Sequence, residues 1–128
     1  MKLSRIFLSV STFGALTMAS LSAHALDCNN AMTTRDMVEC AQMDYNIADG
    51  DLNYAYQDLR AGADKTGKLK LRDAQRAWIK FRDAECDRQA DAVRGGTMAP
   101  LIQMSCLADL TAKRAAELGI NPMTGESN

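Results

Sequence analysis

An unbroken three-and-four spacing of apolar residues is the feature of this sequence that most restricts its fold. The apolar positions, in chain order, are Met37, Ala41, Tyr45, Ala48, Leu52, Tyr56, Leu59 and Ala63. Steps of three and four residues place side chains on one face of an α-helix. No proline lies between Leu26 and Ala99, and Thr33 can cap the start of a helix. The pattern predicts one long helix over residues 33–62, in which Gly50 costs about 1 kcal/mol relative to alanine.

Glycines mark both ends of a second helix. Residues 64–67, Asp-Lys-Thr-Gly, predict a turn, and a helix is expected from there over residues 68–93. Gly95 and Gly96 should end it, because glycine adopts the left-handed conformation without steric penalty.

Thr97 is expected to cap a third helix that ends at Leu118. Pro100 lies in its first turn, where the missing N–H group costs little. Residues 119–128 are polar and contain a proline, so we expect a flexible tail there. Two short connections between three helices predict an all-α fold, a small antiparallel three-helix bundle.

The first 25 residues have the composition of a secretory signal peptide. Lys2 and Arg5 precede an apolar stretch, and Ala23 and Ala25 stand where a signal peptidase reads small residues. The apolar stretch is too short and too rich in serine and threonine for a good membrane span. We therefore expect cleavage after Ala25, a helical domain over residues 26–118, and a periplasmic or secreted protein without a membrane anchor.

Loss of the signal peptide would also remove His24, the one histidine of the chain. It would leave 103 of the 128 residues, with 13 basic and 16 acidic side chains and a net charge of −3. Without an imidazole there is no Ser-His or Cys-His nucleophile pair and no histidine metal ligand. A strongly basic face, which nucleic acid requires, is missing as well. A carboxylate pair can hydrolyse a glycan, but these carboxylates are predicted on solvated helix faces, so we expect a non-enzymatic protein without cofactor or metal.

Four cysteines follow the signal peptide: Cys28, Cys40, Cys86 and Cys106. An even number in an exported chain predicts two disulfides. Cys86 and Cys106 lie nine and ten residues from the glycine pair between their helices, so an antiparallel bundle places them at one height. This favours Cys86–Cys106 and leaves Cys28–Cys40. Cys40–Cys86 is an open alternative, because these two residues also lie at similar heights.

Two stripes of residues with helical spacing are expected to face each other across the first turn. The stripes are Asp49, Asn53 and Tyr56 on the first helix and Gln75, Trp78 and Arg82 on the second. Because a partly buried charge needs a partner, we expect Asp49 to pair with Arg82. We interpret this polar network as structural, with a ligand site as the alternative, and Trp78 as a core residue.

The end of the second helix carries a row of carboxylates. Asp83, Asp87 and Asp91 repeat at steps of four, where like charges repel and oppose the helix dipole. A solvated face explains such a row, and the alternative is a docking patch for a basic partner. The candidate patch comprises Asp87, Asp91, Gly95, Gly96 and Thr97. The glycines also suit an ordinary helical corner.

Residues in both halves of the chain resemble a known family. They are Cys28, Cys40, Ala48-Asp49, Leu52-Asn53 and Tyr56, then Ala74-Gln75-Arg76-Ala77-Trp78-Ile79, Arg82-Asp83-Ala84-Glu85-Cys86, Gly95-Gly96-Thr97, Cys106 and Arg114-Ala115-Ala116-Glu117-Leu118. This ordered combination resembles the LprI-like lysozyme inhibitor N-terminal domain family. The resemblance implies a small exported helical protein with paired cysteines and, for some relatives, inhibition of lysozyme.

Two functions are compatible with this resemblance. One is a protein that binds and blocks a basic lysozyme-type muramidase, with the acidic helix end and the short loop as its contact. The other is an envelope interaction, immunity or stress module with a different protein partner. The resemblance supplies no inhibitory motif that can be carried over residue by residue.

Overall fold

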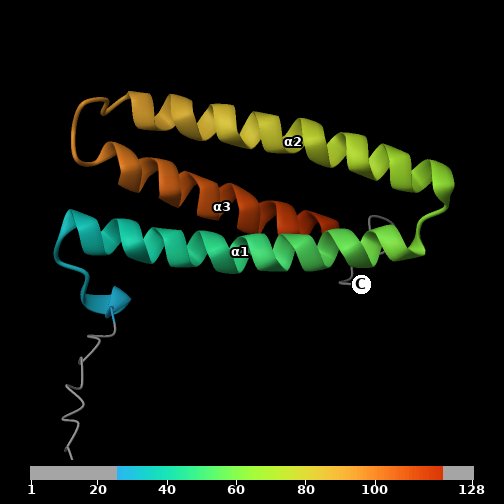
Figure 1. Cartoon of the computed structure of the whole chain (residues 1–128), viewed down its shortest axis with the longest axis horizontal. Helices are drawn as coiled ribbons and strands as arrows, with labels where there is room; N and C mark the ends of the chain where they lie inside the picture. The colour runs from blue at the N-terminus through green and yellow to red at the C-terminus, as the bar shows by residue number, and fades with distance from the viewer. Residues whose placement is uncertain (1–25, 120–128) are drawn as a thin grey trace, which may run out of the picture.

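Three α-helices and one short 3₁₀ helix form the part of the chain that the computed structural model describes, residues 26–119 (Figure 1). The elements are η1 (Cys28–Asn30), α1 (Thr34–Gly62), α2 (Lys65–Asp91) and α3 (Ala99–Gly119). No strand occurs among the described residues, and the all-α prediction is confirmed. The expected signal peptide, and residues 120–128 of the expected tail, lie outside the described residues.

α1 begins and ends where its sequence pattern predicts. The hydroxyl of Thr33 accepts a hydrogen bond from the backbone N–H of Asp36 at 3.1 Å, which satisfies one of the free donors of the first turn. The buried residues of α1 are Cys40, Ala41, Ala48 and Leu52. They share one face, as the apolar spacing predicts.

α2 begins three residues earlier than predicted. The carboxylate of Asp64 accepts a hydrogen bond from the backbone N–H of Gly67 at 2.7 Å, so Asp64 caps a helix that already includes Lys65. The turn expected over residues 64–67 is therefore the cap and first turn of α2. An aspartate three residues before a glycine suits both a turn and the N-terminal cap of a helix. For this reason the sequence pattern alone placed the start of α2 too late.

The connection between α2 and α3 is longer than predicted. α2 ends at Asp91 and α3 begins at Ala99, so Thr97 lies within the connection rather than at the cap of α3. Gly95 has a φ of +77°, the left-handed conformation expected for it. Consecutive turn hydrogen bonds fill this corner, and the last of them joins the N–H of Ala99 to the carbonyl of Gly96.

α3 lies between α1 and α2 over much of the bundle (Figure 1). Its contacts with α1 are the most extensive in the described chain, whereas α1 and α2 contact each other little. Alanines are buried along α1 at Ala41 and Ala48 and along α3 at Ala108 and Ala115. Small side chains of this kind let two helix backbones approach closely. Towards the far end of α3 the core consists of Leu52, Ala115 and Leu118, packed against partly buried Tyr56, Leu59, Leu71 and Trp78.

Two disulfides join the elements, with the pairing predicted from the heights of the cysteines in the bundle. Cys28 is bonded to Cys40, with 5.6 Å between their Cα atoms, and Cys86 to Cys106, with 5.5 Å. The first ties η1 to α1, and the second ties α2 to α3. The alternative Cys40–Cys86 pair is thereby excluded, and no cysteine within residues 26–119 is free.

Candidate functional site

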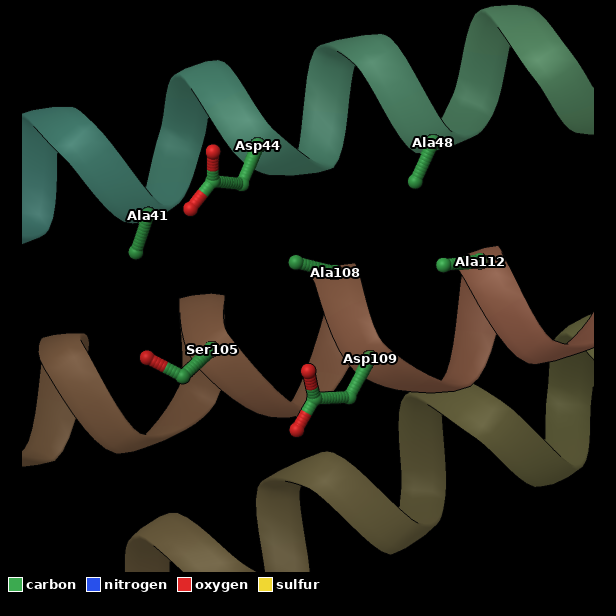
Figure 2. Close-up of a pocket in the computed structure, with 7 residues that line it drawn as sticks. All are labelled: Ala41, Asp44, Ala48, Ser105, Ala108, Asp109 and Ala112. Atoms are coloured by element: carbon green, nitrogen blue, oxygen red, sulfur yellow. The ribbon is translucent and has the colours of Figure 1, made fainter.

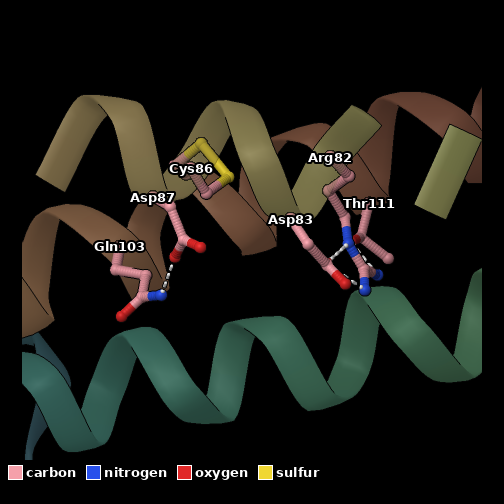
Figure 3. Close-up of polar contacts among 7 residues, drawn as sticks. Arg82, Asp83, Cys86, Asp87, Gln103 and Thr111 are labelled. Carbon is pink, nitrogen blue, oxygen red and sulfur yellow. Dashed lines mark hydrogen bonds and ion pairs between the residues drawn. A yellow bond between two sulfur atoms is a disulfide. The ribbon is translucent and has the colours of Figure 1, made fainter. Parts of the chain in front are cut away.

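A buried arginine links all three helices near the middle of the bundle (Figure 3). Arg82 of α2 is only 7% exposed. Its Nη1 group donates a hydrogen bond to the hydroxyl of Thr111 on α3 at 3.3 Å, and its Nη2 group forms an ion pair of 2.8 Å with Asp83. Thr111 is fully buried. The guanidinium therefore has both a neutralising carboxylate and a polar partner on the neighbouring helix, as a buried charge requires.

Aromatic rings complete the surroundings of this arginine. The guanidinium carbon of Arg82 lies 5.6 Å from the ring centroid of Tyr45 on α1 and 5.3 Å from that of Trp78 on α2. Arg114 of α3 lies 5.8 Å from the same tryptophan ring. These distances are those of cation–π contacts. The arrangement joins the three helices around a guanidinium that is nearly closed to solvent.

The expected ion pair between Asp49 and Arg82 is wrong. The carboxylate of Asp49 accepts a hydrogen bond from Asn53 on its own helix at 3.1 Å, whereas Arg82 pairs with Asp83 and Thr111. The prediction assumed that α1 and α2 face each other directly. Because α3 lies between them, it supplies the polar partner, and Arg82 meets α1 at the ring of Tyr45 instead.

The other two members of the expected network also have different partners. The side-chain oxygen of Gln75 accepts a hydrogen bond from Nε of Arg114 at 3.3 Å, and Tyr56 packs against the hydrophobic core. Sequence reasoning missed Tyr45, Thr111 and Arg114 as members of this cluster. The sequence contained a signal for Thr111. Once Cys86 is paired with Cys106, Arg82 (four residues before Cys86) and Thr111 (five residues after Cys106) lie at similar heights on two antiparallel helices.

Ion pairs neutralise most of the carboxylate row at the end of α2. Asp83 pairs with Arg82, Glu85 with Arg88, and Asp91 with Arg94. Asp87 differs, because the hydrogen bond recorded for its carboxylate comes from the uncharged side chain of Gln103 at 2.6 Å (Figure 3). Within the predicted docking patch, Asp87 is therefore the carboxylate that presents the most uncompensated charge.

The Glu85–Arg88 pair has the largest electrostatic effect at this end of the molecule. Hydrogen bonds from Arg88, and next from Gln89, hold the pKa of Glu85 at about 2, well below its ordinary 4.5. The same pair raises the pKa of Arg88. Arg88 and Gln89 thus keep Glu85 in its charged form, and the charge is paired within α2.

The glycines of the predicted patch have a backbone explanation. Gly95 has a positive φ, and a Cβ atom added at Gly96 would lie 3.2 Å from the carbonyl oxygen of Val93. Both positions therefore favour glycine for the geometry of the corner. Thr97 is exposed, and with Val38 and Glu39 it lines a shallow depression between this corner and the start of α1. The structure places the predicted patch at one end of the bundle.

A shallow groove runs between α1 and α3 (Figure 2). It is lined by Ala41, Asp44, Ala48, Ser105, Ala108, Asp109 and Ala112. Asp44 and Asp109 place carboxylates on its two sides, and alanines form much of the rest. No group of three or more metal-ligating side chains occurs among residues 26–119.

The interior of the described chain is fully hydrogen-bonded and its cysteines are paired. Every buried side-chain nitrogen or oxygen in residues 26–119 has a hydrogen-bond partner, and the cysteines there are all oxidised. None of its helices has both the length and the apolar character that crossing a membrane requires. Rigid helices with exposed charged faces are suited to binding another macromolecule.

These features define a small all-α protein stapled by two disulfides. The family described as "Lysozyme inhibitor LprI" matches residues 27–118, and the chain belongs to this family. It is 39% identical over 105 residues to "Uncharacterized protein R02472" of Rhizobium meliloti (strain 1021), covering 72% of this chain and 76% of the relative. It is also 39% identical over 59 residues to "Uncharacterized protein YecT" of Escherichia coli (strain K12), covering 38% and 36%. No solved structure matches the chain.

Proposed function

We propose that this protein binds and inhibits a lysozyme-type peptidoglycan hydrolase in the periplasm or outside the cell. The observation that carries the proposal is the match of residues 27–118 to the family described as "Lysozyme inhibitor LprI". The match spans all three helices and both disulfides. The signal-peptide pattern of the first 25 residues supports the location, because peptidoglycan hydrolases act in the envelope or outside the cell.

The fold supports inhibition by occupation of a surface. Two disulfides and a fully hydrogen-bonded interior hold the helices in place before binding, and a preorganised surface loses little conformational entropy on association. A stable complex typically buries about 800 Å² on each partner. Helices of 29, 27 and 21 residues offer faces of that size.

Charge supports a basic partner. The chain after residue 25 carries a net charge of −3, and complementary charge raises the rate of association. We propose that Asp87, with Asp91 and the connection at Gly95, Gly96 and Thr97, contributes to the first encounter. Asp87 is the strongest candidate, because its carboxylate has an uncharged partner whereas Asp91 is paired with Arg94.

A turbidity assay tests the proposal. The purified, oxidised protein would be titrated into a basic lysozyme acting on cell-wall substrate, and the initial rate of clearing would be measured. We expect a dose-dependent loss of rate and a 1:1 complex by calorimetry. A reduced and alkylated sample is the control and should inhibit less. Absence of both inhibition and binding across a panel of lysozymes would contradict the proposal and favour a different envelope partner.

A further inference from the structure

The outer face of α1 carries large apolar side chains that the bundle does not cover. Met43, Ile47 and Tyr54 are 49%, 64% and 77% exposed. Their spacings of four and seven residues place them in one row along the helix. This row lies on the side of α1 away from its buried alanines, and α1 forms one edge of the bundle (Figure 1). We name Met43, Ile47, Gly50 and Tyr54 the α1 outer stripe.

Gly50 lies in the middle of this stripe without a structural reason in the described chain. Glycine is the poorest helix former after proline, and Gly50 is in the interior of a 29-residue helix. Its φ is not positive, and a Cβ atom added to it would meet nothing within 4 Å. Neither the backbone nor the packing therefore requires glycine here. What glycine does provide is a notch between Ile47 and Tyr54 that admits close approach by another molecule.

The charge around the stripe indicates the chemistry of that molecule. α1 carries six carboxylates, at Asp36, Glu39, Asp44, Asp49, Asp51 and Asp58, and two arginines, at Arg35 and Arg60. The ion pair recorded within α1 joins Arg35 to Glu39. Most of these carboxylates therefore have no cationic partner among the described contacts, in contrast to the row at the end of α2.

A second copy of the chain fits this surface poorly. Pairing two α1 outer stripes would place two helices of the same strong negative charge against each other, and like charges at close range destabilise an interface. A basic partner avoids this repulsion. Its cationic side chains can meet the carboxylates while an apolar group enters the notch at Gly50.

We propose that the α1 outer stripe is the docking surface for a basic protein and that Tyr54 is its main anchor. Tyrosine is enriched among the residues that dominate binding energy, because it buries a large rigid surface. The identity of the partner as a lysozyme-type hydrolase rests on the proposed function. The stripe supplies an apolar contact, whereas the acidic corner formed by Asp87, Asp91 and residues 95–97 supplies charge. A depression lined by Glu39 and Thr97 lies between that corner and the start of α1.

Two pairs of variants test the stripe, with affinity measured for the basic lysozyme that the wild-type chain inhibits most strongly. Gly50→Ala should raise the melting temperature by about 4 °C yet weaken binding about tenfold, because a methyl group enters the notch. Gly62→Ala is the matched control, since Gly62 also lies in α1 with open space around it. It should leave affinity unchanged.

The second pair compares exposed aromatic residues. Tyr54→Ala should weaken binding about thirtyfold, whereas Phe81→Ala removes a 58% exposed ring from α2 and should have no effect on affinity. Equal affinity of wild type, Gly50→Ala and Tyr54→Ala for an inhibited lysozyme would overturn the stripe and leave the proposed function standing. Lack of binding by the wild type would overturn both. A wild-type dimer in sedimentation that Tyr54→Ala converts to a monomer would assign the stripe to a second copy instead.

Discussion

Arg82 donates a hydrogen bond to Thr111 across the α2–α3 interface, over a distance of 3.3 Å between Nη1 and Oγ1. Thr111 is fully buried and Arg82 nearly so. The bond lies about one helical turn from the Cys86–Cys106 disulfide, so a covalent bond and a polar contact fix the same register of two helices. The carboxylate of Asp83 neutralises the buried guanidinium, and the Asp83 side chain itself is 55% exposed to solvent.

Arg82→Leu should destabilise the fold by about 1–3 kcal/mol, because the buried hydroxyl of Thr111 loses its partner. Asp83 can be hydrated in the variant, so a larger loss from a buried unpaired carboxylate is not expected. Arg72→Leu is the matched control, since Arg72 also pairs with the following aspartate but is exposed, and its removal should change stability by less than about 0.5 kcal/mol. Urea denaturation monitored by circular dichroism measures both. Equal destabilisation by the two variants would contradict the structural role of Arg82.

Loss of the Cys86–Cys106 disulfide should cost more stability than loss of Cys28–Cys40. Each closes a loop, of 20 and 12 residues respectively, and each constraint contributes about 2–4 kcal/mol. Cys86 is also completely buried between α2 and α3, whereas Cys28 is exposed and its bond holds only the short η1. Serine at both positions of Cys86–Cys106 therefore places two hydroxyls in the interior, whereas serine at both positions of Cys28–Cys40 places one, at Cys40.

Thermal unfolding of the two double-serine variants checks this order, with the fully reduced wild type as reference. We expect helical circular dichroism at 25 °C to persist without Cys28–Cys40 and to fall without Cys86–Cys106. An unchanged melting temperature on full reduction would show that the bundle does not depend on its disulfides.

Local chemistry made most of the fold predictable from the sequence. The apolar spacing of α1 and the cap at Thr33 are properties of neighbouring residues, and the glycine pair sets the levels of Cys86 and Cys106. The position of α3 between α1 and α2 is not a local property. For that reason the expected contact between Asp49 and Arg82 was wrong. The register of α2 against α3, which the Cys86–Cys106 disulfide sets, predicts better that Thr111 is the partner of Arg82.

The candidate binding surfaces were less predictable than the fold. A row of carboxylates such as that near Asp87 is visible in the sequence, but the arginines that neutralise its neighbours are found only from side-chain geometry. The significance of Gly50 was equally hidden. A mid-helix glycine is compatible with close packing against a neighbouring helix or with an open surface, and the structure shows open space around Gly50.

Protonation of Glu85 should lower stability in a defined pH range. Its pKa is held at about 2 in the folded chain, against an ordinary 4.5, so the folded state favours the charged form. The stabilisation is complete above pH 4.5, decreases as the pH falls, and is lost once the pH is below about 2. Denaturation curves recorded between pH 5 and pH 2 should show a steeper loss of stability for wild type than for Glu85→Gln. Parallel curves for the two proteins would contradict the assignment of this pair.

Reversal of Asp87 should slow association with a basic lysozyme more than reversal of Asp91. Asp87 has the uncharged Gln103 as its partner, whereas the charge of Asp91 is already met by Arg94. We expect Asp87→Lys to reduce the association rate constant at low salt and to weaken its dependence on ionic strength, with a smaller change in the dissociation rate constant.

Asp73→Lys is the matched control for Asp87→Lys, because it makes the same change of net charge on α2 at an exposed carboxylate that is paired with Arg72. Stopped-flow or surface-plasmon measurements at two or more salt concentrations separate the two rate constants. If Asp87→Lys and Asp73→Lys slow association equally, the effect belongs to the net charge of the protein and the end of α2 has no special part in the encounter. If Asp87→Lys alone slows it, the acidic corner guides the partner towards the bundle.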